Sequence, residues 1–472
     1  MKNKGFTLVE LLAVIVVLAI IALIGYSSVG NIISSTQNNS NKVTMKNYAK
    51  AVDQAIFLYE MNNSDSDVPE LNSTWLKENV KFEKATVECE YATYDKTSSL
   101  YGCKINDSDK TYCYTSDTAV ECNKNKLSKI YGSSLQNGTP TPTSPVEIES
   151  VGEKTKNLFD YDNTPAPYSP ITKQNNGYKV SYGFIRFYTY QALTNYIGET
   201  VTISFDLTTS EDGDFQIYQY QSNGIGIRFT SVTEKMSANT ATKITLTGKV
   251  EELGTNKDYS KGEIIVYKKD YTGDYFVNNI QFEKGSTATS YEPYGYKVPI
   301  TVSNGSDTKT TNIYLKEPLR KVGEYADYLD LTNKKVVRNT KEIVFNGTES
   351  WQKHNNLNTY YVNNTSIKHS DNISCYSDKY KGQVSGAGNS YGSGNMWIQS
   401  TSSYPRIYIS NDNYATVDTF KTYLASNNVT GYFVLETTAE ESIDVPEIPS
   451  LTGNVTYTIG TNVKPNKLEY GY

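Results

Sequence analysis

The sequence contains few of the residues that enzymes most often use for catalysis. It has 2 histidines, His354 and His369, and neither lies in a recognisable catalytic motif. A nucleophile elbow, a phosphate-binding loop and a histidine cluster are all missing. Asp212 and Asp214 could serve as the paired acids of a glycosidase, but they flank Gly213 and are better explained as turn residues, with calcium binding at this loop left open. We therefore expect a protein that is not an enzyme and has no cofactor.

The chain also lacks a basic surface and the cysteine spacings that bind zinc. Its 45 Lys and Arg residues against 51 Asp and Glu residues give a net charge of -6. An acidic surface does not attract phosphate backbones, so nucleic acid is not an expected partner. None of the 5 cysteines forms a Cys-x-x-Cys pair, and we predict no metal site. Tyrosine is abundant by contrast, with 41 residues against 14 phenylalanines, which suits exposed β-structure outside a cell.

Long apolar runs are missing except for one, Leu11 to Ile24, near the start of the chain. Lys2 and Lys4 precede this run, and Glu10 lies directly beside it. A helix from Phe6 to the end of the run would be about 30 Å long, enough to cross the hydrocarbon core of a membrane. Glu10 would then lie inside the membrane edge, where an ionised side chain is unfavourable unless it finds a cationic partner.

A cut between Gly5 and Phe6 would create such a partner, because the new α-amino group could pair with Glu10 of a neighbouring subunit. The motif around this bond, Gly5-Phe6-Thr7-Leu8-Val9-Glu10-Leu11-Leu12, resembles the prepilin leader junction of type IV pilins and their pseudopilin relatives. The resemblance implies that residues 1–5 are a leader removed by a prepilin peptidase, and that Phe6 is then N-methylated. A secretory signal would instead place its small-residue cleavage site after the apolar run.

The same resemblance implies where the protein resides and what it assembles with. Lys2 and Lys4 supply the charge of the leader, and Glu10 is the assembly residue. The subunit is expected in the inner or cytoplasmic membrane before assembly. Afterwards it is expected in an extracellular filament at the cell surface, with other pilin subunits as its partners.

Residues 6–62 are predicted to form one long helix that spans the membrane and builds the filament core. In its second half, apolar residues recur at helical spacing, and their face should pack on a globular head: Met45, Ala49, Val52, Ile56 and Tyr59. Residues 63–130, which contain several short alternating runs, are predicted to form this head as a small antiparallel sheet.

Four of the 5 cysteines lie in this predicted head: Cys89, Cys103, Cys113 and Cys122. An even number of cysteines in a small exported domain predicts two disulfides, and the sequence leaves all three pairings open. Cys375 stands far from the others and is better explained as a small buried apolar residue than as a nucleophile.

The remainder of the chain is predicted to contain a linker and two β-rich modules. Residues 131–145 hold Pro140, Pro142 and Pro145 and should form an extended, semi-rigid linker. Residues 146–296 show many short strand patterns and almost no helical periodicity, which favours a β-sandwich. Asp212-Gly213 is expected to turn a hairpin between two of these strands.

The segments at the two ends of this sandwich resemble a known family. Asn157-Leu158-Phe159-Asp160 at its entry, with Ile280 to Ser286 and Tyr291 to Tyr294 at its exit, are similar to carbohydrate-binding-like jelly rolls of phage tail and minor structural proteins. Residues 297–472 continue the likeness, because Pro318 to Tyr328 is similar to the module that often follows that jelly roll. The resemblance implies a second β-rich module there, in which we expect one short helix at Asp418 to Ala425.

Alternation along one predicted strand suggests a ligand-binding face. Phe215 and Ile217 should point into the core, which places Tyr218 and Tyr220 together on the opposite face. Two tyrosines one pleat repeat apart could stack on sugar rings, and we predict glycan binding there. Tyrosine is also an ordinary strand former, so half-buried cover is the competing interpretation.

Taken together, the sequence predicts an α+β protein that is mostly β: a long helix, a small disulfide-bonded head, a jelly-roll-like sandwich and a second β-rich module. The expected function is that of a type IV pilin-like subunit, minor or at the filament tip, which displays adhesion modules that bind surface glycans. One alternative is a pseudopilin of a type II secretion or DNA-uptake machine, with the modules as spacers. A soluble phage-type structural protein is the other, and the leader junction argues against it.

Overall fold

The computed structural model describes the backbone of residues 8–62, 70–106, 110–122, 125–163, 171–174, 176–181, 183–188, 193–220, 224–253, 263–270, 272–354, 358–368, 372–386, 391–400, 405–451 and 455–472. Side chains are described within these ranges except for residues 8–34, Tyr220, Leu253 and Ser400. The chain divides into two units, of which unit 1 comprises Met1–Ser128 with Glu469–Tyr472 and unit 2 comprises Lys129–Leu468. The chain passes between them within the strands β6 (Lys126–Tyr131) and β34 (Lys467–Gly471).

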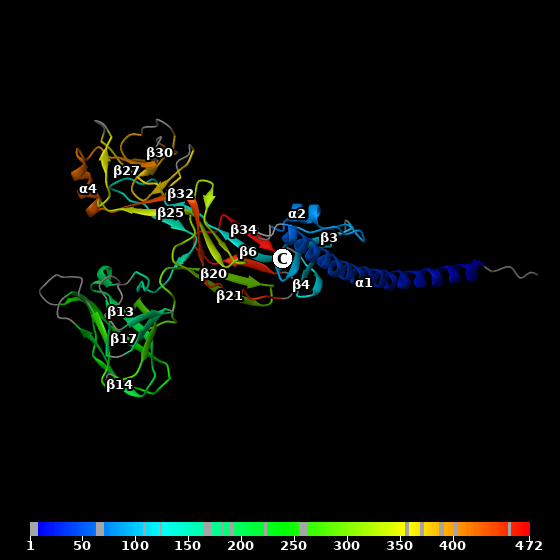
Figure 1. Cartoon of the computed structure of the whole chain (residues 1–472), viewed down its shortest axis with the longest axis horizontal. Helices are drawn as coiled ribbons and strands as arrows, with labels where there is room; N and C mark the ends of the chain where they lie inside the picture. Colours follow the sequence, from blue (N-terminus) through cyan, green and yellow to red (C-terminus); the bar gives the residue numbers. More distant parts are fainter. Residues whose placement is uncertain are drawn as a thin grey trace, which may run out of the picture. The chain divides into compact units, whose positions relative to one another are not determined.

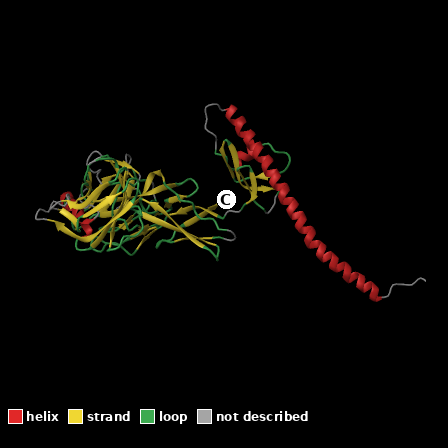
Figure 2. Ribbon diagram, turned by 90° about the horizontal axis from the view of Figure 1, so that it is seen from below, coloured by secondary structure: helices red, strands yellow, loops and turns green. Residues whose placement is uncertain are grey.

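Unit 1 is organised around the helix α1 (Leu8–Asn62). Met45, Ala49, Val52 and Ile56 recur at helical spacing, and each is at most 1% exposed, which confirms the predicted buried face. Tyr59, the last residue predicted on this face, is half-buried. Figure 2 shows α1 lying across the small sheet of this unit, with which the buried residues share one core.

The sheet of unit 1 is antiparallel and is stapled by disulfides, as predicted. Its strands pair in the order β1-β3-β4-β5, with β2 added on β3. The bonds join Cys89 to Cys103 and Cys113 to Cys122, which selects one of the three open pairings. The elements are α2 (Ser73–Asn79), β1 (Val87–Glu88), β2 (Tyr91–Asp95), β3 (Thr97–Ile105), β4 (Tyr112–Thr115) and β5 (Thr118–Glu121).

The last residues of the chain belong to unit 1. The hydroxyl of Tyr472 donates a hydrogen bond to Oε1 of Glu90 at 2.7 Å. Its ring lies against Gly102, where a Cβ atom would stand 2.6 Å from the hydroxyl oxygen. Gly102 also has a φ of 66°, so both the close approach and the backbone require glycine there.

Unit 2 contains two antiparallel sheets that enclose one core. Three of their strands, β13, β14 and β17, are labelled in Figure 1. One sheet has the order β10-β11-β19-β13-β17-β15 and the other β12-β18-β14-β16. The strands are β10 (Ile171–Gln174), β11 (Gly177–Val180), β12 (Phe184–Tyr188), β13 (Thr200–Thr209), β14 (Gly213–Tyr220), β15 (Gly224–Arg228), β16 (Val232–Met236), β17 (Thr242–Leu253), β18 (Glu263–Lys268) and β19 (Tyr275–Lys284), and the 3-10 turn η1 spans Thr194–Tyr196.

Strands of this pair of sheets bond in a nested series, in which β11 pairs with β19, β12 with β18, β13 with β17 and β14 with β16. Successive strands from β11 to β19 therefore alternate between the sheets. The prediction of a hairpin at Asp212-Gly213 is wrong, because the strands before and after this turn, β13 and β14, lie in different sheets. The turn carries the chain across the core and not along one sheet.

A second core lies between two further sheets of unit 2. Their orders are β28-β32-β25-β24-β6-β34 and β26-β27-β31-β30-β29. Neighbouring strands from β28 to β6 in the first sheet and from β26 to β30 in the second are antiparallel, and β29 and β30 are parallel. The strands are β24 (Tyr328–Asp330), β25 (Lys335–Phe345), β26 (Gln352–Lys353), β27 (Thr359–Asn363), β28 (Tyr376–Ser377), β29 (Lys381–Gly382), β30 (Asn395–Ser400), β31 (Pro405–Ser410) and β32 (Val429–Ser442).

Helix α4 (Val417–Ser426) covers this second core close to the predicted position, with Phe420 and Leu424 buried. It begins after Thr416, whose side chain accepts a hydrogen bond from the backbone N–H of Thr419. Smaller sheets complete the unit: β9 (Glu153–Lys154), β20 (Tyr296–Ser303), β21 (Thr308–Leu315) and β33 (Thr456–Ile459), the pair β22 (Lys321–Val322) and β23 (Tyr325–Ala326), and the pair β7 (Ser134–Gln136) and β8 (Ile148–Ser150).

Residues 131–145, for which an extended linker is expected, make contacts across unit 2. They include β7, and the side chain of Gln136 donates to the carbonyl of Ser377 at 2.7 Å. The carbonyl of Pro142 accepts from the hydroxyl of Tyr423 at 3.3 Å. These partners come from residues far along the chain, so the stretch belongs to the folded part of unit 2.

Candidate functional site

The residues predicted for processing lie at the start of the chain. Lys2, Lys4, Gly5 and Phe6 are outside the described residues, and Glu10 is on α1 with its side chain outside them. In the part of the chain whose side chains the structure describes, no helix combines the length and the apolar character needed to cross a membrane. The roles of these residues therefore rest on the sequence motif.

The predicted glycan face on β14 is described in part. Phe215 and Ile217 are both 0% exposed, as the alternation predicts. Tyr218 on the opposite face is half-buried, and the side chain of Tyr220 is outside the described residues. Glycan binding by this pair stays a prediction.

Cys375 is the cysteine without a disulfide. It is 2% exposed, and its thiol donates a hydrogen bond to the carbonyl of Met396 at 3.5 Å. Burial raises the pKa of Cys375 to about 12, so the thiol is protonated at neutral pH and is a poor nucleophile. These properties agree with the prediction of a small buried apolar residue.

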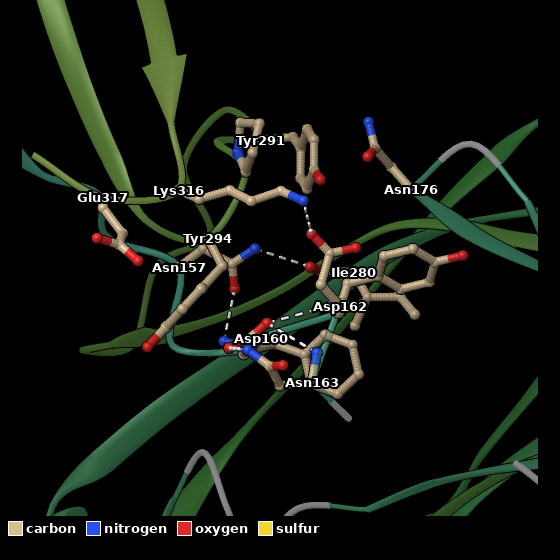
Figure 3. Close-up of a pocket in the computed structure, with 13 residues that line it drawn as sticks. Asn157, Asp160, Asp162, Asn163, Asn176, Ile280, Tyr291, Tyr294, Lys316 and Glu317 are labelled. Atoms are coloured by element: carbon tan, nitrogen blue, oxygen red, sulfur yellow. Dashed lines mark hydrogen bonds and ion pairs between the residues drawn. The ribbon is translucent and has the colours of Figure 1, made fainter. Parts of the chain in front are cut away.

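A cavity of about 220 Å³ lies where the chain enters and leaves the sandwich of unit 2 (Figure 3). We call it the entry pocket. Its walls combine aromatic rings with carboxylate and amide groups. The lining residues are Asn157, Phe159, Asp160, Tyr161, Asp162, Asn163, Asn176, Ile280, Tyr291, Pro293, Tyr294, Lys316 and Glu317.

Asn157 holds the entering and leaving segments together at the base of the entry pocket. It is 2% exposed, and its amide nitrogen donates to the carbonyls of Ile280 at 2.9 Å and Glu292 at 3.0 Å. Its side-chain oxygen accepts from the backbone N–H groups of Phe159 at 2.9 Å and Phe282 at 3.1 Å. Because this buried amide is fully bonded, the pocket wall is fixed by hydrogen bonds as well as by packing.

The acidic side of the pocket is a tight loop that orients one carboxylate. Asp160 accepts hydrogen bonds from the backbone N–H groups of Asp162 and Asn163, both at 3.1 Å. Its second oxygen accepts from the side-chain amide of Asn163 at 2.8 Å. A carboxylate held in this way presents its remaining lone pairs in a set direction.

Two lysines approach the same loop. Nζ of Lys316 lies 3.2 Å from Oδ2 of Asp162, an ion pair that Figure 3 shows as a dashed line. The hydrogen bond to Asp162 and the negative charge of Asp162 raise the pKa of Lys316. Lys173 donates to the carbonyl of Tyr161 at 2.6 Å and stands 4.2 Å from the centre of that ring. The pocket thus offers donors next to acceptors.

Tyrosines form the apolar surface of the pocket. Burial, followed by the charge of Asp162, raises the pKa of Tyr291 to about 12, so its hydroxyl stays neutral and able to donate. Tyr294 is 41% exposed and offers an accessible ring at the pocket. Flat rings beside fixed carboxylate and amide groups suit a ligand that has both apolar faces and hydroxyl groups, as a sugar does.

The entry pocket does not fit a metal centre formed by several acidic, cysteine or histidine ligands. Among the described residues, no group of three or more such side chains lies close enough to hold an ion. Asp160 and Asp162 are instead engaged with amide donors and with Lys316.

The two segments that form this pocket are the entry and exit segments of the sandwich, for which the sequence predicts a family likeness but no site. The entry segment contains Asn157 and Asp160, and the exit segment contains Tyr291 and Tyr294. The hydrogen bonds from Asn157 to Ile280 and Glu292 could not be predicted from the sequence, because these partners lie 123 and 135 positions away from Asn157. The pocket exists only once these segments pair.

Comparisons with known proteins give one sequence match and distant structural likenesses. Residues 1–26 match the family model described as the prokaryotic N-terminal methylation motif. This is the leader motif of type IV pilins and pseudopilins, and it implies membrane insertion, processing by a prepilin peptidase and assembly with pilins. No curated protein matches the chain.

Among solved structures, the chain is similar to the tripod (BppUct-A-L) from the baseplate of bacteriophage Tuc2009, with 14% identity and a TM-score of 0.21 over 51% of this chain and 91% of that chain. It is also similar to the arabinose-bound MgGH51 α-L-arabinofuranosidase, with 10% identity and a TM-score of 0.19 over 34% of this chain and 32% of that chain.

Proposed function

We propose that this protein is a type IV pilin-like subunit, minor or at the filament tip, which displays β-rich adhesion modules at the cell surface. The methylation motif at residues 1–26 supports the pilin-like part of the proposal. The disulfide-stapled head packed on α1 is consistent with export, because such bonds persist outside the cytoplasm. Unit 2 supplies the modules for display.

We further propose that the sandwich of unit 2 is a jelly roll that binds glycans. The nested pairing of β11 with β19 through β14 with β16 supports the jelly-roll assignment, because that fold is a long folded-over hairpin wrapped into two sheets. The observation that carries the binding proposal is the entry pocket, whose lining includes both the accessible ring of Tyr294 and the oriented carboxylate of Asp160.

Binding suits this pocket better than catalysis. Asp160 accepts three hydrogen bonds from its own loop, and Asp162 is paired with Lys316. Groups held in this way orient sugar hydroxyls but are poorly placed to exchange protons. Contacts of this kind give affinities of about micromolar to millimolar strength, so several copies along a filament would be needed for firm attachment.

The assembly proposal is tested by the N-terminus of the protein extracted from membranes. Mass spectrometry should find methylated Phe6 as the first residue. Replacing Glu10 by alanine should keep the subunit in the membrane but reduce its recovery in filaments. An intact Met1 or a cut after Ile24 contradicts the pilin-like assignment.

The binding proposal is tested by screening the full-length, detergent-extracted protein on a glycan array. A Tyr294→Ala variant should lose most of the binding, because an accessible ring is removed without opening the core. A Tyr218→Ala, Tyr220→Ala variant in the same sandwich distinguishes the two candidate faces. If that variant alone loses binding, the ligand lies on β14; if no glycan binds, the spacer role of a pseudopilin is favoured.

A further inference from the structure

The helix α1 carries apolar side chains on the face that is turned away from the head. Val43, Phe57, Leu58 and Met61 are between 57% and 65% exposed. Val43 and Phe57 are separated by close to four helical turns, and Lys50 lies halfway between them on the same line of the helix. We call these five residues the outer row. Exposed apolar side chains that gather on one side of a helix mark a contact surface.

The head also contains a groove of about 440 Å³, whose lining combines apolar and charged side chains. We call it the head groove. Tyr48 and Leu76 are its most buried lining residues, and the ring of Tyr48 meets the ring of Phe82 edge-on at 5.4 Å. The full lining consists of Tyr48, Leu76, Lys77, Val80, Phe82, Glu83, Ala85, Thr86, Val87, Glu88 and Asn106.

The outer row and the head groove lie on opposite sides of α1. Tyr48 in the groove and Phe57 in the row are separated by about two and a half helical turns, so their side chains project in opposite directions. Each copy of the chain therefore presents the row on one side of its head and the groove on the other. A contact between these two surfaces joins copies head to tail and does not close into a symmetric dimer.

The charges on the two surfaces are complementary. Among the side chains that the structure describes, Lys50 forms no ion pair, and neither Glu83 nor Glu88 forms one. All three side chains are exposed. Lys77 is the remaining charged residue of the lining, so the groove carries more negative than positive charge. A lysine that approaches the groove is therefore attracted to it.

We propose that the head groove of one subunit receives the outer row of a second copy of this chain. Phe57 enters the groove against Phe82, where its ring leaves water. Lys50 lies about 10 Å from Phe57 along the helix, so its long side chain can reach Glu83 and Glu88 at the groove. The contact rests on the proposed role as a filament subunit. It places several copies in succession, which repeats the display modules along the filament.

The test measures self-association of the full-length, detergent-extracted protein by sedimentation velocity at increasing protein concentration. Phe57→Ala should weaken the association by about tenfold or more, because the central ring of the contact is lost. Lys50→Glu should weaken it by about three- to tenfold. Adding Glu83→Lys and Glu88→Lys to the Lys50→Glu chain should restore it to within about threefold of the wild type. Val120→Ala, at an exposed apolar residue of β5, is the matched control and should change it by less than about twofold.

Filament assembly and this contact can fail separately. Glu10→Ala should reduce recovery in filaments but keep the self-association in detergent, because Glu10 belongs to neither surface. A protein that stays monomeric at every concentration would overturn the proposal. Weakening by Phe57→Ala without rescue by the reversed charges would overturn it as well, since the outer rows would then pack on one another.

Should the charge-reversed chain fail to fold, cross-linking decides. Phe57→Cys in one tagged population and Glu83→Cys in another should form a disulfide between copies under mild oxidation, whereas Val120→Cys with Glu83→Cys should not. The native cysteines do not interfere, because four are disulfide-bonded and Cys375 is buried. Equal cross-linking of the two pairs would count against the proposed contact.

Discussion

The head in unit 1 and the sandwich in unit 2 become stable in different ways. The core of the head includes the disulfide-bonded Cys89 and Cys103 together with the buried face of α1. The core of the sandwich contains no cysteine and is filled by contacting rings, among them Phe159, Phe187 and Phe205. The head sheet has strands of two to nine residues and buries little apolar surface, so it gains from cross-links, whereas a larger two-layered core does not need them.

The two regions also differ in how far apart their bonded strands lie in the sequence. In the head, β3 pairs with β2 and β4, its neighbours along the chain. In the sandwich, β11 pairs with β19, and the whole nested series lies between them. Distant pairing requires the closure of long loops, so we expect the sandwich to fold more slowly than the head.

The largest expected effect comes from breaking the core on which the sandwich depends. Phe205 is 1% exposed, and Phe205→Ala should lower the free energy of unfolding of the sandwich by about 3 to 5 kcal/mol. Hydrogen exchange measured by mass spectrometry should show faster exchange in peptides from β11 to β19 and unchanged exchange in unit 1. Phe57→Ala is the matched control, because Phe57 is 59% exposed and its loss should change stability by about 0.5 kcal/mol or less.

Removing the cross-links should have the next largest effect, and only in the head. Replacing Cys89 and Cys103 together by serine should destabilise unit 1 by about 2 to 4 kcal/mol, since the unfolded chain regains the freedom that the bond removes. Thermal melting with exchange readout should leave the sandwich unchanged. Cys375→Ala serves as the control, and its response to reductant should equal that of the wild type; a shared loss in both units would disprove their independence.

Local features of the sequence predicted local structure well. The spacing of Met45, Ala49, Val52 and Ile56 located the buried face of α1, and the clustered cysteines indicated the disulfides. Asp212-Gly213 shows the limit of such patterns. The residues do turn the chain, but a Cβ on Gly213 would lie 2.5 Å from Cε of the buried Lys268, so a larger residue there would displace that side chain. That constraint comes from β18, which contains Lys268 and lies far along the chain. The sheet to which β14 belongs is also decided by its pairing with β18.

The candidate sites show the same limit. The processing motif is contiguous, so residues 1–26 identify it without any contact to the rest of the chain. The entry pocket requires Asp160 and Tyr294 to line one cavity, and the stacking of Trp397 on Tyr408 requires β30 and β31 to pair in one register. Strand register and sheet order determine which distant residues become neighbours, and neither can be predicted from the pattern of a single strand.

The smallest expected difference between the units concerns tyrosine ionisation at high pH. Burial raises the pKa of Tyr48 in unit 1 to about 12, and the residue is 4% exposed. An unfolded tyrosine titrates near pH 10, so the folded state favours the neutral phenol, and the stability of unit 1 is complete below about pH 10 and falls as the pH rises toward 12. A pKa shift of this size corresponds to roughly 2 to 3 kcal/mol of stability at the upper end of this pH range.

Tyr48→Phe keeps the ring against Phe82 and removes the ionisable group, so unit 1 of this variant should lose less stability between pH 10 and 12. Pulsed proteolysis with fragments identified by mass spectrometry follows each unit separately, and unit 2, where burial likewise raises the pKa of Tyr291 to about 12, should respond equally in the wild type and the variant. Identical alkaline profiles for unit 1 in both proteins would show that Tyr48 does not link its stability to pH.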